Sequence, residues 1–453
     1  MRDFLAELAA RRRFGMKPGL DAIRSVCTCL DDPQRKFRAI HVAGTNGKGA
    51  VCAILDSTLR AAGLRIGRYT SPHLVMLNER FFLDGAPISD EILEKHAETV
   101  ENALCNWGLS PKNGGLSPNI TFFEALTAVG FLAFAEAKPA FAILECGLGG
   151  RLDATNVCLP AICAITRIGL DHCDWLGGTV EAIAMEKAGI IKPGVPVVLG
   201  KNSPTVRDVV SARAAEVDAP FVYAPDVADE SEIPDGFSLA GAFNRENAVT
   251  ALAVLKTLGR GPTTIPHEAV SRGFASVIWP GRFQRVRNFI IDGAHNPPAA
   301  EALSATLAET STRKKSLSLI AGFCGDKDAG RVLALLAPFV RRALAVRVDN
   351  PRSLSAEATA EAMRLAGMDS TPCGSLAEAI AAVGDAPTLI CGSLFLAGGA
   401  LVALGAYPWP HPRRDPSEVL HPGQGRSRGP QDQCSSSLRS SSSSVAASSQ
   451  SAV

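Results

Sequence analysis

Short apolar runs alternate with longer helical patterns over the first 260 residues of the chain. Runs of strand length cover residues 37–44, 140–147, 161–169 and 195–200. Apolar positions at helical spacing cover residues 49–63, 121–137 and 245–258. This alternation is typical of βαβ units, in which helices cover a parallel sheet. We therefore predict that the chain begins with a mostly parallel α/β domain of the P-loop type.

A second, shorter alternation begins near residue 286. Its strand-like runs cover residues 286–295, 316–323, 343–349 and 387–391, with alanine-rich helical segments between them. We predict a smaller doubly wound α/β domain here. The expected organisation is a nucleotide-binding domain over 1–270, a linker over 271–285, a C-terminal domain over 286–410 and a disordered Pro- and Ser-rich tail over 411–453.

One uncharged stretch, residues 386–412, is long enough to raise the question of a membrane span. Its glycines and prolines divide it into a strand-like part over 387–391 and a short helix-like part over 394–404. At the N-terminus, acidic residues lie inside the apolar stretch and arginines follow it, which is the reverse of a signal peptide. We predict a cytoplasmic protein without a membrane span.

Composition points to small-molecule chemistry. The chain has 453 residues, is 46% hydrophobic and carries a net charge of +1, so it can bury a sizeable core and has no overall field for nucleic acid or a membrane surface. Its 12 cysteines are scattered without zinc spacing, which favours reduced thiols in a cytosol.

The segment HVAGTNGKGA, residues 41–50, follows a predicted strand and opens a predicted helix. In that setting, free backbone N–H groups and the helix dipole face an anion. The strict phosphate-loop pattern requires an earlier glycine and a hydroxyl residue after the lysine. This chain has Val42 at the position of the earlier glycine, and it has Gly49 and then Ala50 after Lys48. Taken alone, the segment is compatible with a nucleotide site or with an ordinary glycine turn and a solvated lysine.

Further segments along the chain carry a family resemblance. GTNGKG resembles the phosphate loop of the Mur ligase superfamily. The segments YTSPHL (69–74), TFFEA (121–125), LECGLGGRLDATN (144–156), DHCDWLG (171–177), EKAGIIKPG (186–194) and DGAHNP (292–297) follow it in order. Together they resemble the folylpolyglutamate synthase and dihydrofolate synthase branch, over about residues 15–405. The resemblance implies a Mur-ligase-like fold and an ATP-dependent ligase that joins a carboxylate to an amine.

The resemblance also implies a set of residues for ATP and metal. The positions that match the nucleotide site are Thr45, Asn46, Gly47, Lys48, Gly49, Asn247, Arg282, Asp292 and His295. Those that match magnesium ligands are Ser71, Glu145 and His172, with K+ as an additional candidate cation. Lys48, His172 and Lys187 are the expected catalytic residues, and Lys187 matches a lysine that is carbamylated in this family.

Each of these assignments has a plainer alternative. Glu145 could cap the glycine turn that follows it, His172 could be an ordinary loop histidine, and Lys187 a lysine on a helix surface. Asp292 would accept from the ribose or hold its own loop, and His295 would lie near the base or be structural.

The pterin end is expected at two further segments. Phe122 and Phe123 can sandwich a flat heterocycle, and Glu124 can accept from its N–H groups. Leu152, Asp153 and Ala154 match another part of the family's pteroate pocket. The alternative for the first segment is the start of an amphipathic helix with core aromatics.

The leading hypothesis is a ligase, expected to be a monomer, that adds L-glutamate to dihydropteroate and then to the γ-carboxylate of tetrahydrofolate through an acyl phosphate. One alternative is another Mur-type amide ligase, such as a UDP-muramoyl ligase. Such ligases carry an N-terminal domain of about 80–100 residues, for which a phosphate loop beginning at residue 44 leaves no room. A second alternative, motivated by Ala50, is a nucleotide-binding module without turnover. Glu145, His172, Lys187 and Asp292 argue against it.

Overall fold

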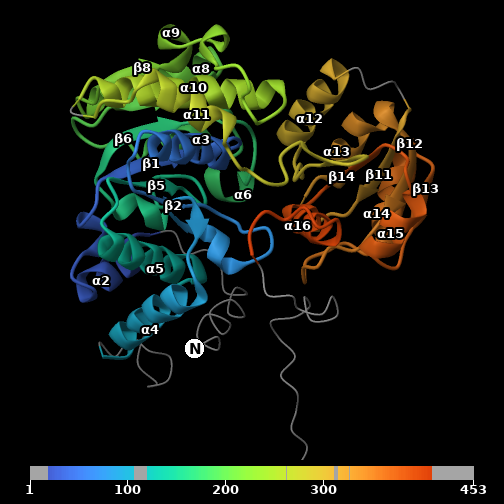
Figure 1. Cartoon of the computed structure of the whole chain (residues 1–453), viewed down its shortest axis with the longest axis horizontal. Helices are drawn as coiled ribbons and strands as arrows, with labels where there is room; N and C mark the ends of the chain where they lie inside the picture. Colours follow the sequence, from blue (N-terminus) through green and yellow to red (C-terminus); the bar gives the residue numbers. More distant parts are fainter. Residues whose placement is uncertain (1–18, 107–119, 262, 311–314, 326, 411–453) are drawn as a thin grey trace, which may run out of the picture.

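A computed structural model describes residues 19–106, 120–261, 263–310, 315–325 and 327–410. The chain forms two α/β lobes that lie side by side (Figure 1). The first contains an eight-stranded sheet of order β4-β3-β2-β5-β1-β6-β7-β8, and the second a six-stranded sheet of order β13-β12-β11-β14-β10-β9. The predicted fold class is confirmed.

The first sheet is parallel from β2 to β8, with β3 and β4 antiparallel at one edge. Its strands are β1 (Ala39–Ala43), β2 (Ile66–Tyr69), β3 (Phe81–Leu83), β4 (Ala86–Pro87), β5 (Phe141–Glu145), β6 (Pro160–Ile165), β7 (Val197–Leu199) and β8 (Phe221–Tyr223). β1 lies between β5 and β6, with Val42 opposite Glu145. The carboxyl ends of these central strands therefore meet at one edge, where parallel sheets place their ligands.

Helices cover both faces of this sheet. They are α2 (Asp21–Cys29), α3 (Lys48–Ala61), α4 (Asp90–Asn106), α5 (Phe122–Ala137), α6 (Cys173–Leu176), α7 (Val180–Ala188), α8 (Pro204–Glu216), α9 (Ala224–Val227), α10 (Ala242–Gly259) and α11 (His267–Ala275). Short 3-10 helices are η2 (Pro33–Arg35), η3 (Leu77–Arg80), η5 (Ala154–Val157) and η6 (Glu230–Glu232). α3 packs against α10 and α11 on one face, while α2, α4 and α5 pack together on the other.

The three helices expected in this domain form close to the predicted bounds, because their apolar positions repeat at helical spacing. α5 also carries its own start signal, since Thr121 accepts from the backbone of Glu124 and the Glu124 side chain accepts from the backbone of Thr121. It ends at Lys138, whose φ of 50° lies in the left-handed region.

The second lobe is doubly wound, as predicted. Its strands are β9 (Gln284–Val286), β10 (Phe289–Ile291), β11 (Leu317–Ala321), β12 (Val340–Ala345), β13 (Ser370–Pro372) and β14 (Thr388–Cys391). Its helices are α12 (Pro297–Glu309), α13 (Ala329–Leu336), α14 (Ala356–Leu365), α15 (Leu376–Val383) and α16 (Leu394–Ala403), with the 3-10 helix η7 (Ala337–Phe339).

One predicted strand is wrong in detail. Residues 286–295 do not form a single strand, because β9 and β10 pair antiparallel across a tight turn. Arg287 in that turn has a φ of 54°, a left-handed conformation that no regular strand contains.

Two of the connections between the lobes lie at the two ends of the second lobe. The segment between α11 and β9 connects them along the chain, and the change of sheet falls there. The exact domain boundaries stay a prediction, and the predicted disordered tail lies outside the described residues. The second connection is a return strap, residues 407–409, in which the Tyr407 hydroxyl donates to Glu79 and the Trp409 ring lies 5.1 Å from that of Phe82.

Within the described residues, no helix is long and apolar enough to cross a bilayer. The part of the uncharged stretch that is described folds into β14 and α16, as its glycines and prolines predict.

Candidate active site

The phosphate loop connects β1 to α3 and is packed closely from two sides. Gly47 has a φ of 89°, and a Cβ placed there would lie 2.1 Å from Oδ1 of Asn247 on α10. A Cβ placed on Gly49 would lie 2.2 Å from the Trp279 ring. Glycine is therefore required at both positions. Asn247, an expected nucleotide residue, lies directly against the loop.

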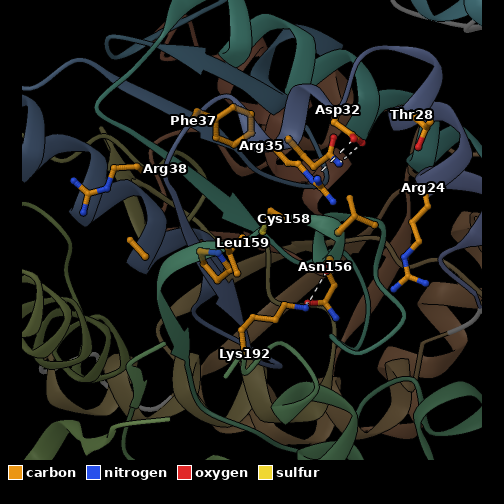
Figure 2. Close-up of a pocket in the computed structure, with 14 residues that line it drawn as sticks. Arg24, Thr28, Asp32, Arg35, Phe37, Arg38, Asn156, Cys158, Leu159 and Lys192 are labelled. Carbon is orange, nitrogen blue, oxygen red and sulfur yellow. Dashed lines mark hydrogen bonds and ion pairs between the residues drawn. The ribbon is translucent and has the colours of Figure 1, made fainter. Parts of the chain in front are cut away.

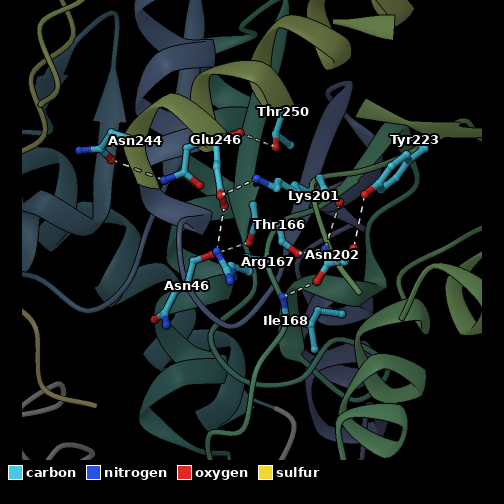
Figure 3. Close-up of polar contacts among 12 residues, drawn as sticks. Asn46, Thr166, Arg167, Ile168, Lys201, Asn202, Tyr223, Asn244, Glu246 and Thr250 are labelled. Atoms are coloured by element: carbon cyan, nitrogen blue, oxygen red, sulfur yellow. Dashed lines mark hydrogen bonds and ion pairs between the residues drawn. The ribbon is translucent and has the colours of Figure 1, made fainter. Parts of the chain in front are cut away.

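Polar contacts fix this loop to the segment that follows β6 (Figure 3). Thr45 donates its backbone N–H to the Arg167 carbonyl at 3.0 Å, and the Thr166 hydroxyl donates to the Asn46 carbonyl at 2.8 Å. Behind them, Glu246 on α10 pairs with Arg167 at 3.1 Å and with Lys201 at 3.3 Å. The loop is thus held in place before any ligand binds.

Two lysines converge on one carbonyl of the loop. Lys48 Nζ donates to the carbonyls of Gly44 and Thr45, both at 3.1 Å, and Lys187 Nζ donates to Gly44 at 2.8 Å. Lys187 is 4% exposed. Its burial and then the charge of Lys48 lower its pKa to about 7. It is not the surface lysine of the alternative interpretation.

Glu145 lies at the end of β5, beside the loop. Its side chain is buried and accepts from the backbone N–H of Ser71 at 3.0 Å. Burial raises its pKa, and the charges of Lys48, Arg282 and Arg68 oppose that rise. Glu145 does not cap the glycine turn, because the N–H groups of Gly147 and Leu148 donate to Asp153 instead.

His172 comes from the loop after β6. Its side chain is 41% exposed, and its Nε2 lies 3.9 Å from Oδ1 of Asp171. Burial lowers its pKa, Asp171 opposes this, and Lys327, Lys48 and Lys187 lower it further. The charge of Lys48 thus acts on the pKa of both His172 and Glu145, so these two predicted metal residues lie within electrostatic range of the same lysine.

These donors suit a magnesium ion bound together with phosphate. Across the described ranges, no group of three or more His, Cys, Asp or Glu side chains could hold a metal alone. Glu145, His172 and Ser71 offer a carboxylate, an imidazole and a hydroxyl. Mg2+ usually binds through one or two carboxylates and completes its shell with water and phosphate oxygens.

The connecting segment contributes a cation, and the second lobe contributes a loop. Arg282 lies near enough to Glu145 for its charge to oppose the rise in the pKa of that carboxyl. Asp292 is buried and accepts from the backbone N–H groups of Phe283 at 2.7 Å and Ala294 at 2.8 Å, so it holds its own loop. Burial lowers the pKa of His295 to about 4, and its Nδ1 lies 2.8 Å from the Gly293 carbonyl. His295 is therefore neutral at pH 7 and positioned by that contact.

At the expected pterin end, the aromatics lie between core and surface. Phe122 and Phe123 pack on the apolar cluster under α5. A Cβ on Gly147 would lie 2.6 Å from the Phe123 ring, and Arg80 lies over the Phe122 ring at 5.8 Å. Oε2 of Glu124 accepts from Thr121, at 2.8 Å from its N–H and 2.7 Å from its hydroxyl. The structure thus gives Glu124 a helix-capping role, and its ligand role stays a prediction.

Asp153 is also held within the fold. Besides the N–H groups of Gly147 and Leu148, it accepts from the N–H and hydroxyl of Thr155, at 3.0 and 2.5 Å. Leu152 is half-buried, and Ala154 is 5% exposed. Phe123 and Asp153 both contact Gly147, so the two expected pteroate segments meet at the glycine turn. Their ligand roles also stay predictions.

A large hollow lies elsewhere. A hollow of about 900 Å³, shown in Figure 2, lies where β1 and β6 begin, at the end of the sheet opposite to the phosphate loop. Arg24, Arg35, Arg38 and Lys192 are among its lining residues, and none of the predicted site residues is. The chemistry of the side chains, rather than the size of the hollow, locates the candidate active site.

Sequence reasoning missed several residues of the site. Trp279 packs on the phosphate loop, and Asn296 and Lys327 of the second lobe reach Asp171. Asp171 and Asn296 lie inside the quoted motifs, next to His172 and His295, and that adjacency was the available signal.

Comparison with known proteins agrees with this geometry. Residues 281–394 match the family described as Mur ligase, glutamate ligase domain. A dihydrofolate synthase/folylpolyglutamate synthase of Bacillus subtilis is 35% identical over 376 residues, which cover 76% of this chain and 84% of the relative.

Two solved structures have the same fold. Folylpolyglutamate synthase of Mycobacterium tuberculosis, complexed with ADP and AMPPCP, matches with a TM-score of 0.78 and 33% identity, over 90% of this chain and 100% of the other. The bifunctional enzyme of Yersinia pestis, complexed with AMPPNP and a Mn ion, matches with a TM-score of 0.76 and 32% identity, over 89% and 97%. The chain therefore belongs to the dihydrofolate synthase/folylpolyglutamate synthase family of Mur-type ligases.

Proposed function

We propose that this ATP-dependent ligase adds L-glutamate to dihydropteroate and to the γ-carboxylate of tetrahydrofolate. The observation that carries the proposal is that Lys48 and Lys187 both donate to the phosphate loop, while the charge of Lys48 acts on the pKa of both Glu145 and His172, and that of Arg282 on the pKa of Glu145. The free thiols among the described cysteines suit a cytoplasmic setting.

The phosphate loop would bind the triphosphate of ATP. The backbone N–H groups at the start of α3 face the anion, and Lys48 exchanges its two carbonyl contacts for phosphate oxygens. Arg282, from the segment between α11 and β9, adds a planar cation. These groups stabilise the charge that develops as the terminal phosphate moves to the substrate carboxylate.

Glu145, His172 and Ser71 would hold magnesium, which when bound neutralises phosphate charge and aligns the reacting oxygens. Neither residue after Lys48 carries a hydroxyl, and Ala50 is 4% exposed and belongs to the apolar cluster under α3. The methyl group of Ala50 offers no oxygen ligand to magnesium, and a water molecule can occupy that ligand position instead. We therefore expect turnover, in contrast to a module that only binds nucleotide.

Lys187 has an unusual environment for a lysine. With a pKa lowered to about 7, a large share of its amine is neutral at physiological pH. A neutral amine can add CO2 and release a proton, which converts the cation into a carbamate anion. We propose this modification for Lys187, where the anion would face the charge of Lys48.

Chemistry would then proceed in two steps. The substrate carboxylate attacks the terminal phosphate of ATP and gives an acyl phosphate and ADP. The amine of L-glutamate attacks the acyl carbon, phosphate leaves, and the amine loses a proton. Because the charged groups come from both lobes, the closed arrangement excludes water from the acyl phosphate.

The test is glutamate-dependent release of ADP, with dihydropteroate and tetrahydrofolate compared side by side. We expect turnover with both, and a product one glutamate heavier in each case by mass spectrometry. Turnover only with a UDP-muramoyl peptide would support the rival Mur-type ligase. Binding of ATP without ADP release in any mixture would support the module without turnover.

A further inference from the structure

Asp171 lies where the two lobes contact each other. Its side chain is 18% exposed and lies in the loop between β6 and α6. Its Oδ2 accepts from Nδ2 of Asn296, at the start of α12 in the other lobe, at 2.9 Å. Oδ1 lies 3.9 Å from Lys327 Nζ, also in that lobe. One carboxylate of the first lobe thus faces an amide and a cation of the second.

The same carboxylate also acts on its neighbour His172. Oδ1 accepts from the backbone N–H of His172 at 2.9 Å and lies 3.9 Å from its Nε2. His172 has a φ of 53°, in the left-handed region where a side chain other than glycine is rarely found. Asp171 therefore contributes to holding the unusual backbone that aims the imidazole.

Asn296 uses both ends of its amide. Its Oδ1 accepts from the backbone N–H of Ala299 at 2.9 Å and caps α12, while its Nδ2 donates to Asp171. Serine or aspartate would cap a helix as well as asparagine does. Aspartate has no N–H to donate, and serine is too short to cap and to reach across at once. The contact to Asp171 explains why asparagine stands here.

The loop that carries Asp171 is also tied to the phosphate loop. The Thr45 hydroxyl donates to the Gly169 carbonyl and accepts from the Gly169 backbone N–H, both at 3.1 Å. A continuous set of contacts therefore runs from the phosphate loop, through Gly169 and Asp171, to Asn296.

We propose that Asp171 is a positioning residue that latches the lobes together and sets the orientation of His172 when the second lobe is docked. This inference rests on the proposed function, in which His172 holds the metal. Opening the latch releases α12 and loosens His172 in the same event.

Asn296→Asp opens the latch and keeps the cap. The new carboxylate still accepts from Ala299, but it faces Asp171 with a like charge. We expect kcat to fall about tenfold or more, which is the effect of losing a hydrogen bond to a charged group. The control Ser355→Asp places the same charge at the exposed cap of α14, away from the latch, and should leave kcat unchanged.

The double variant Asp171→Asn with Asn296→Asp reverses donor and acceptor. The new amide at position 171 can accept from His172 and donate to the new carboxylate at position 296, so both contacts form again with the polarity exchanged. We expect the double variant to regain most of the lost kcat. Asp171→Asn alone keeps an acceptor for Asn296 and should lose only a few-fold.

Domain closure gives a readout that does not depend on activity. Small-angle scattering with AMPPNP and Mg2+ should show wild type and the double variant more compact than Asn296→Asp. Equal compactness of all three, wild-type kcat in Asn296→Asp, or a double variant no better than the single one would overturn the latch. If the wild-type protein releases no ADP, the proposed function fails, and scattering still decides the latch.

Discussion

Near the phosphate loop, few hydrogen bonds hold the charged side chains. Lys48 and Lys187 donate to carbonyls of the loop, and Glu145 accepts from the backbone N–H of Ser71. At the α5 and η5 end, Glu124 and Asp153 each accept several hydrogen bonds from the fold itself. A charged group with few contacts can turn to a ligand at small cost, whereas one with several contacts cannot without loosening its surroundings. The comparison separates charged groups that are available to a ligand from charged groups that hold the fold.

The largest effect on activity is expected at the phosphate loop. Lys48→Met removes the cation that would neutralise the terminal phosphate, and kcat should fall by about 10²–10³ with little change in melting temperature. Steady-state ADP release measures it. The surface variant Lys36→Met serves as control, and a Lys48→Met loss no larger than that of the control would contradict the assignment.

The largest effect on stability is expected at the other end. Asp153→Ala leaves four donors of the turn and of η5 without their acceptor, at a cost of about 3 kcal/mol in the free energy of unfolding. Asp229→Ala is the matched control, since Asp229 caps η6 by the same contact to Ser231 but at an exposed site. Its cost should be about 1 kcal/mol or less. Equal costs in urea unfolding would show that Asp153 is not structural.

Lys187 should give the protein a pH-dependent stability. Its pKa is lowered from 10.5 to about 7, so between these values the unfolded state binds more protons than the folded state. Stability therefore rises with pH through this window, by at most about 1.4 kcal/mol per pH unit. Lys187→Met should remove this slope, and the surface variant Lys95→Met should keep it. Urea unfolding at pH 7 to 9 in CO2-free buffer measures it, and an unchanged slope in Lys187→Met would refute it.

The smallest effect is expected for Glu124→Gln. This variant distinguishes the helix-capping role of Glu124 from its predicted role as a pterin ligand. Glutamine still completes a capping box, so the free energy of unfolding should change by less than about 0.5 kcal/mol. Loss of the negative charge should raise KM for dihydropteroate several-fold if the side chain also meets the pterin, as we predict. An unchanged KM would leave Glu124 with its capping role alone.

Much of the fold follows from local pattern. The strands and helices around the phosphate loop form where apolar periodicity predicts them, because that periodicity decides which face is buried. The hairpin of β9 and β10 was missed, since one left-handed residue, Arg287, reverses the chain and leaves no signal in hydrophobicity.

The candidate site was predicted mainly through motifs, and contacts between motifs were not. Asp153, not Glu145, binds the N–H groups of the glycine turn, and only three-dimensional structure decides between two nearby carboxylates. The packing of Trp279 on Gly49 joins residues 230 positions apart in the chain, which no local pattern encodes.

The return strap has a mechanical consequence. The second lobe is fastened to the first both where the chain enters it and where Tyr407 and Trp409 meet Glu79 and Phe82. Between these two ends, the second lobe also meets the first at Asp171, through Asn296, and at Leu74, which packs against α16. Because both ends of the second lobe are held, loss of the contact between Asp171 and Asn296 should leave the lobe attached and limit how far it can swing away from the phosphate loop.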